Sequence, residues 1–113
     1  MKLIKAFIHD VRTPDVLQAL ADAGFRNVTL QAVRGALRPV SESEHDYSIE
    51  SGGLIISETR VSLVVEDTQV EKVTSIIQAV AHIGKGISGY LYVIPVEQAL
   101  PIRAPHESAP SSV

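Results

Sequence analysis

The chain has 113 residues, a mass of 12.2 kDa and 45% hydrophobic residues, which is enough for one domain with a single modest core. Its 10 Lys and Arg residues against 13 Asp and Glu residues give a net charge of −3, which argues against a nucleic-acid partner. The absence of cysteine excludes disulfides, a thiolate nucleophile and zinc sites built on cysteine.

Charged and polar side chains interrupt the apolar N-terminal segment MKLIKAFIHD. A signal peptide needs an unbroken apolar centre, and here Lys5 and His9-Asp10 fall inside it. No apolar run elsewhere approaches the roughly 18 residues of a transmembrane helix. We therefore expect a cytoplasmic protein with no direct membrane insertion.

The first two predicted elements differ in the spacing of their apolar residues. Residues 3–9 alternate between two faces with the period of two that is typical of a strand. Thr13 followed by Pro14 indicates an N-cap and a first helical turn, and the apolar residues that follow share one helical face up to Gly24. The sequence therefore predicts a strand and then a helix over about residues 14–23.

Two further segments, residues 27–33 and 60–66, are rich in β-branched residues and predict strands. The segment between them, residues 36–57, is far longer than a hairpin loop, and such a loop in a small domain is usually functional. Its acidic and histidine side chains are either ligands for a cation or simply solubilising charge. They are Glu42, Glu44, His45, Asp46 and Glu50.

The second half of the chain repeats the helix and strand pattern. Thr68 and Glu71 have the spacing of a capping box, and apolar residues at helical spacing after them predict a second helix that ends near Gly84. Residues 90–94 then predict a fourth strand, which Pro95 ends.

The glycine-rich segment 84–89, GKGISG, is either a plain turn or an anion site. Glycine lets successive backbone N–H groups approach a phosphate, and Lys85 adds a positive charge. Arg34, Arg38 and Arg103 are further anion candidates, with solvated surface arginine as the alternative.

The resulting order βαββαβ predicts an α+β, ferredoxin-like sandwich, in which two helices cover one face of a four-stranded antiparallel sheet. The first strand, however, carries Leu3 and Phe7 on the face opposite Ile4 and Ile8, and the last strand is apolar on both faces. The second face of the sheet should therefore meet another subunit, and we expect an oligomer.

The remaining features favour a binding protein over an enzyme. Residues 1–103 form the domain, and the Ser- and Pro-containing tail 104–113 is expected to be disordered. His9 and His82 have no carboxylate at helical or strand spacing, so they are interpreted as structural, and no nucleophile stands out. A hydrolase of the acylphosphatase type is an alternative because Arg12 follows the first strand, but its glycine-bearing phosphate loop is absent.

Five stretches, in their order and spacing over residues 1–103, resemble the PII signal-transduction family: MKLIKAFI, DVLQALADAGF, VRGALR, VSLVVED and GKGISGYLYVIPVEQALPIR. The resemblance implies a homotrimer that binds ATP or ADP in clefts between subunits. It also implies that residues 36–57 are the "T-loop", which reaches a transporter or an enzyme. The implied nucleotide-binding residues are Thr29, Gly35, Arg38, Val64, Gly86, Ile87, Ser88, Gly89 and Arg103. The implied partner-binding residues are Glu42, Glu44, His45, Asp46, Tyr47 and Ser51.

The chain departs from the family pattern at positions that carry charge. Tyr90 and Pro101 stand where similar proteins have cations that meet phosphate, so we expect ADP or AMP to be favoured over ATP, with a small anion such as bicarbonate as a possible co-ligand. Pro39 and Glu58 replace a glutamine and a lysine that help to bind 2-oxoglutarate, which a nearby carboxylate would repel. Ser51 occupies the position of a tyrosine that some members have uridylylated. A metal-sensing or metal-tolerance trimer, linked to heavy-metal efflux, is the alternative.

Overall fold

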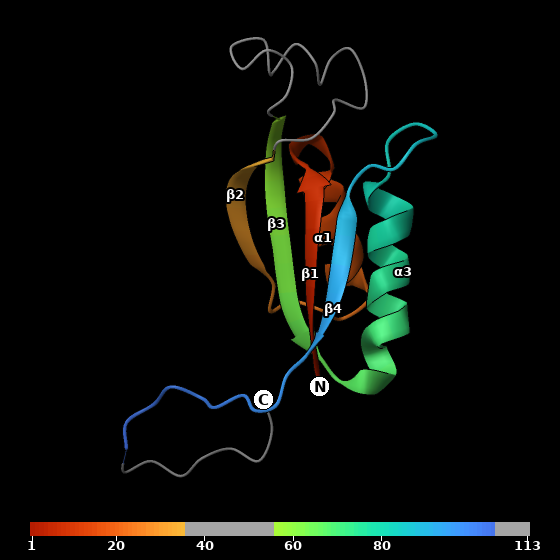
Figure 1. Ribbon diagram of the computed structural model, residues 1–113. Coiled ribbons are helices and arrows are strands. Elements are labelled where there is room, and N and C mark those ends of the chain that lie inside the picture. The colour runs from red at the N-terminus through yellow and green to blue at the C-terminus, as the bar shows by residue number, and fades with distance from the viewer. Residues whose placement is uncertain (36–55, 106–113) are drawn as a thin grey trace.

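The computed structural model describes residues 1–35 and 56–105 (Figure 1). Two short 3-10 turns, η1 (Asp10–Arg12) and η3 (Asp67–Gln69), precede the helices. The main elements are β1 (Lys2–His9), α1 (Thr13–Asp22), β2 (Thr29–Gly35), β3 (Ile56–Val65), α3 (Val70–Ala81) and β4 (Tyr90–Pro95). The strands form one antiparallel sheet in the order β2-β3-β1-β4, and both helices lie on the same face of it. The predicted ferredoxin-like βαββαβ fold is confirmed.

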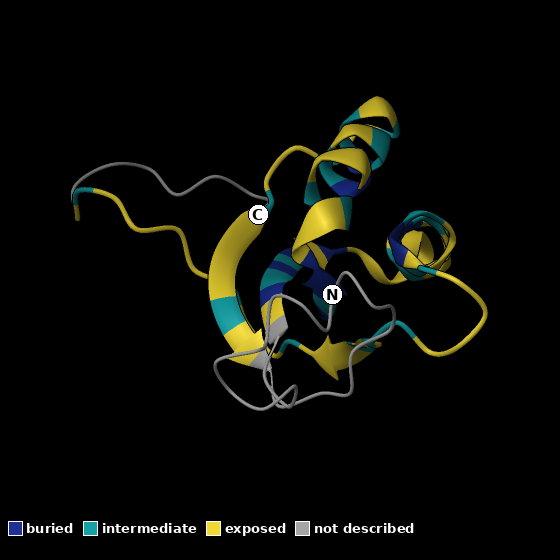
Figure 2. Cartoon of the chain, turned by 90° about the horizontal axis from the view of Figure 1, so that it is seen from above, coloured by how far each residue is buried: buried dark blue, intermediate teal, exposed yellow. Residues whose placement is uncertain are grey.

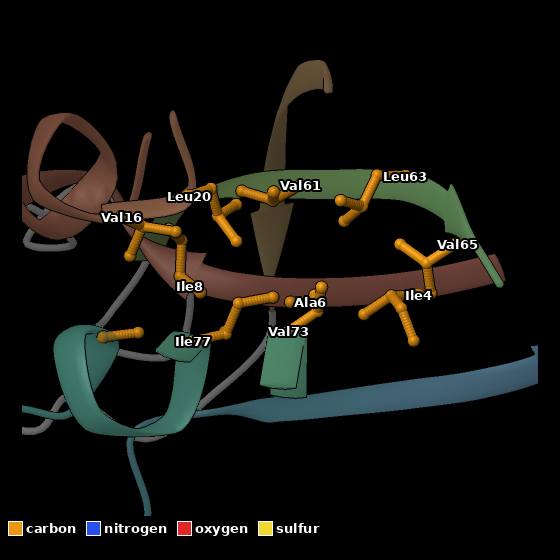
Figure 3. Close-up of a cluster of buried hydrophobic side chains, with 11 residues drawn as sticks. Ile4, Ala6, Ile8, Val16, Leu20, Val61, Leu63, Val65, Val73 and Ile77 are labelled. Atoms are coloured by element: carbon orange, nitrogen blue, oxygen red, sulfur yellow. The ribbon is translucent and has the colours of Figure 1, made fainter. Parts of the chain in front are cut away.

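The register of the central strands explains where the core lies. Ile4 of β1 is paired with Leu63 of β3, and Ala6 is paired with Val61. Because paired residues of antiparallel strands point to the same face, these side chains all face the helices. Figure 3 shows them gathered in one cluster with residues from both helices.

Each helix contributes one apolar stripe to this core. Val16 and Leu20 of α1 are fully buried, and so is Val73 of α3, with Ile77 almost so. Burying a side chain of this size contributes about 1.5 to 3 kcal/mol, so the contact between helices and sheet is the main source of stability. Figure 2 shows the buried residues concentrated between the sheet and the helices, whereas the edge strand β2 is mostly exposed.

The two predicted side-chain caps are wrong. The residues at the N-cap positions are Arg12 and Gln69, and neither makes a side-chain capping hydrogen bond. A 3-10 turn leads directly into each helix, so the backbone N–H of Thr13 donates to the carbonyl oxygen of Asp10, and that of Val70 donates to the carbonyl oxygen of Asp67. The 3-10 turn therefore provides the hydrogen bonds at each helix start that the sequence pattern assigned to capping side chains.

Strand pairing also extends the predicted strands. β2 starts two residues later than predicted and runs on to Gly35, which pairs with Ile56. As a result β3 includes Ile56 and Ser57, which the sequence placed in the long loop. Hydrogen bonding between strands continues past the β-branched segment, because pairing rather than local propensity decides where a strand ends.

The face of the sheet that lies away from the helices carries exposed apolar side chains. Tyr90 and Tyr92 of β4 are 59% and 50% exposed, Val64 is 42% exposed, and Ile94 is 38% exposed. Phe7 meets Tyr92 edge to face, with ring centroids 6.2 Å apart. We call these five residues the outer apolar face. Within the described residues, no helix is long and apolar enough to cross a bilayer.

Candidate functional site

The turn between α3 and β4 is fixed by one side chain. The backbone N–H of Ile83 donates to the Ser88 hydroxyl oxygen over 2.7 Å, and that hydroxyl donates back to the Ile83 carbonyl oxygen over 3.1 Å. Gly84 and Gly89 have positive φ angles, 66° and 152°, which L side chains rarely adopt. The predicted anion-binding turn therefore has a defined shape, closed by Ser88.

Gly35 and the turn lie at the same end of the sheet, where β1 ends (Figure 1). Gly35 is the last residue of β2, and the turn joins β4 next to Phe7, which pairs with Tyr90. Two of the predicted phosphate-binding elements thus occupy one end of the molecule.

The residues predicted to contact adenine lie further along the sheet, and their register places both on the outer face. Thr29 pairs with Ser62, and Val64 pairs with Leu3. Leu3 is four residues before Phe7 on β1, which is about 13 Å at the usual rise of a strand. Val64 also lines a cavity of about 210 Å³ together with Phe25 and Glu66.

Arg103 belongs to neither of these groups. It is exposed, in a segment after β4 that leaves the opposite end of the sheet from the turn (Figure 1). The structure therefore does not bring Arg103 and the 84–89 turn together within one chain. Other predicted site residues lie outside the described part of the chain: Arg38, Glu42, Glu44, His45, Asp46, Tyr47 and Ser51.

Sequence reasoning missed a pair of buried polar residues at the start of β3. His9 and Glu58 are directly opposite each other in the β1–β3 ladder, and only 1% and 3% of their surface is exposed. Spacing along the chain could not reveal this neighbour, because the two residues come together only through the pairing of distant strands. The interpretation of His9 as a structural histidine rested on spacing along the chain, and strand pairing adds Glu58 as its neighbour across the ladder.

A chain of hydroxyl hydrogen bonds lies beside this pair. The Thr13 hydroxyl donates to the Thr59 hydroxyl oxygen, which in turn donates to a carboxylate oxygen of Asp10, each over 2.9 Å. These bonds fix the start of α1 and η1 to β3. They therefore hold the base of the expected T-loop in place.

The alternative of a metal site finds no support in the described residues. No group of three His, Asp or Glu side chains within them is placed to hold a metal ion. The predicted cluster around His45 lies outside the described ranges.

The fold and the turn define a small ferredoxin-like protein with a candidate anion site and an exposed apolar sheet face. Residues 1–106 match the family model described as "Nitrogen regulatory protein P-II", so the chain belongs to this family, as the sequence predicted. It is 34% identical over 107 residues to the Nitrogen regulatory protein P-II of Microchaete diplosiphon, covering 91% of this chain and 92% of that one. It is also 30% identical over 103 residues to the protein of the same name from Azospirillum brasilense, with the same shares covered. The Nitrogen regulatory protein GlnK2 of Haloferax mediterranei is 31% identical over 107 residues, covering 91% of this chain and 84% of that one.

Proposed function

We propose that this family member is a non-enzymatic regulator that assembles as a homotrimer and binds an adenine nucleotide in the clefts between its subunits. It would control a transporter or an enzyme through its T-loop. The observation that carries this proposal is the separation, within one chain, of the adenine residues and Arg103 from the 84–89 turn. A complete site needs these parts to be supplied by different subunits.

The outer apolar face supports the assembly. Its residues are Tyr90, Tyr92 and Ile94 along β4, Phe7 beside them on β1, and Val64 on β3. Exposed apolar side chains grouped on one face mark interaction surfaces. Leu100 and Ile102, in the segment after β4, are also exposed and available to a neighbouring subunit. We therefore expect light scattering to give the mass of three chains.

One pair of variants tests whether this face forms the contact. Ile94→Asp places a charge on the outer apolar face and should shift the protein towards the monomer. Val11→Asp changes an exposed apolar residue of η1, away from that face, and should leave the trimer intact. A wild-type monomer at micromolar concentration would refute the proposed assembly.

In the proposed cleft, the adenine lies near Thr29 and Val64. The phosphates meet Gly35, Arg38, the turn residues 86–89 and Arg103. Tyr90 is an exposed tyrosine at the first position of β4, directly after the turn, where it supplies no positive charge. A site with fewer cations stabilises fewer phosphate charges, so ADP or AMP should bind at least as tightly as ATP. A small anion such as bicarbonate would fit beside these shorter nucleotides.

Calorimetry with ATP, ADP and AMP on the full chain tests this proposal. Arg103→Ala should weaken nucleotide binding by about 1.5 to 3 kcal/mol if its guanidinium contacts phosphate. Arg26→Ala, which changes another exposed arginine, is the control and should have little effect. If none of the three nucleotides binds the wild type, the nucleotide-binding role is refuted.

The proposed regulator is not a sensor of 2-oxoglutarate. Glu58 is a buried carboxyl at the base of the T-loop, and Pro39 has no side-chain amide to offer a ligand. A dicarboxylate approaching this position would meet a carboxyl group where the resemblance implies a lysine, so the position supplies no positive charge to bind it.

A further inference from the structure

A cavity of about 370 Å³ lies on the helix face of the sheet, between α3, β1 and the 84–89 turn. Its apolar floor consists of Ala6, Ile8, Ile77, Ala81 and Leu91. The volume is within the range of about 300 to 1,000 Å³ that is usual for small-molecule sites. The cavity is on the other face of the sheet from Thr29 and Val64, and it meets the proposed nucleotide site only at residues 87–89 of the turn.

Two small residues leave this space open. Ala6 and Ala81 are both buried, on β1 and at the end of α3, and neither has a side chain long enough to fill the gap between the two elements. Because β4 is an edge strand, Leu91 is only half-buried and does not close it. The cavity opens to solvent beside three exposed residues: Gln78 of α3, His82 just after that helix, and Ile87 of the turn.

The chemistry of the walls selects the ligand. Among the described residues that line the cavity there is no Asp, Glu, Lys or Arg, so no charged side chain in its walls can pair with a phosphate or a carboxylate. The Ser88 hydroxyl is already engaged with Ile83. The Nδ1 atom of His82 lies 3.0 Å from the carbonyl oxygen of Ala79, and in the tautomer whose only ring hydrogen is on Nδ1, Nε2 is an acceptor.

We propose that this cavity binds a small, uncharged aromatic molecule that carries one N–H or O–H donor, of the indole or phenol type. The ring packs on the apolar floor, and the donor bonds to His82 Nε2, with Gln78 as the neighbouring polar group. The ligand would also touch Ile87 and Gly89 and so stabilise one shape of the turn. Because the same turn is part of the proposed nucleotide site, the ligand would also change nucleotide affinity. That second effect rests on the proposed function, whereas the binding of the ligand to the cavity does not.

Indole is the probe for the first experiment, in which amide resonances of the full chain are recorded without nucleotide. We expect shifts to gather at Ala6, Ala81 and Leu91. Ala81→Leu fills the cavity and should weaken indole binding at least tenfold. Ala79→Leu, two residues earlier on an exposed face of the same helix, should change it less than twofold.

A second pair of measurements keeps the proposal falsifiable if Ala81→Leu does not fold. His82→Leu at the exposed rim should weaken indole about five- to tenfold while leaving toluene, which has no donor, unchanged. Shifts that gather elsewhere, or equal indole affinity of the Ala79 and Ala81 variants, would overturn the proposal. So would shifts at these amides that follow protein concentration instead of indole, because a second copy would then be the occupant.

Discussion

Gly89 lies against the backbone carbonyl oxygen of Phe7 so closely that a Cβ atom at this position would overlap it. The atom in the way belongs to the central strand β1, which is paired on both sides and cannot move aside. Gly89 also has a φ of 152°, which disfavours other residues. The turn can therefore approach the sheet this closely only because residue 89 has no side chain.

We expect Gly89→Ala to destabilise the protein by about 1 to 3 kcal/mol, because both the overlap and the backbone angle oppose the new methyl group. Gly86→Ala is the matched control in the same turn, since a Cβ there meets no atom within 4 Å. Urea denaturation monitored by circular dichroism measures both. Equal stability of the two variants would contradict the close approach.

Thr59 links Asp10 and Thr13 through its hydroxyl, so Thr59→Val removes both bonds and keeps the shape. The expected loss is about 1 to 3 kcal/mol, because the part-buried Thr13 hydroxyl and the exposed Asp10 carboxylate each lose a partner. The Thr74 hydroxyl bonds only a helix carbonyl oxygen, that of Glu71, so Thr74→Val should cost less. Thermal unfolding of the two variants would show the larger decrease in Tm for Thr59→Val, and the reverse order would exclude the network as a stabilising feature.

Ile77 is 2% exposed at the centre of the helix–sheet core. Ile77→Ala should reduce the free energy of unfolding by about 2 to 5 kcal/mol, because lost burial adds to the cost of the space left behind. Ser75→Ala, on the exposed side of the same helix, should stay within about 0.5 kcal/mol of the wild type. A loss below about 1 kcal/mol at Ile77 would mean that the core closes over the gap.

Asp67 makes the free energy of unfolding depend on pH in the acid range. A hydrogen bond from the Met1 ammonium, 2.6 Å away, and the charge of Lys2 lower the pKa of this carboxyl below 3.8. Its contribution is therefore complete above the unfolded pKa and is lost as pH falls through the lower folded value.

Asp67→Asn should consequently flatten the decrease in stability between about pH 5 and pH 2, while Glu71→Gln, which removes another exposed carboxyl nearby, should change that slope less. Denaturation midpoints across this range give the slopes directly. Parallel curves for Asp67→Asn and the wild type would show that the ammonium contact contributes nothing in solution.

The buried Glu58 predicts that the full chain does not bind 2-oxoglutarate at micromolar concentration, with or without Mg-ATP. Calorimetry with 2-oxoglutarate in the presence of Mg-ATP measures this, and succinate serves as a dicarboxylate control. Micromolar affinity for 2-oxoglutarate but not for succinate would contradict the argument from Glu58.

The order of elements could be read from sequence because it depends on local periodicity. Alternation over residues 3–9 and the helical spacing after Val70 are properties of short segments, and both appear where expected. The partners of His9 and Thr59 could not be read this way, since pairing of β1 with β3 brings them together from distant parts of the chain. The helix caps failed for another reason, because a backbone turn satisfied the N–H groups before a side chain was needed.

The position of β1 in the sheet determines when the fold can close. β1 is made before β3 and β4, yet it pairs with both, and the Met1 carbonyl oxygen accepts a hydrogen bond from the Val96 N–H over 3.2 Å. Contacts over such long sequence separations slow folding, because the loop between them must close first. The sheet therefore cannot be completed until β4 has left the ribosome. A chain that stops before Tyr90 would leave one side of the central strand β1 unpaired.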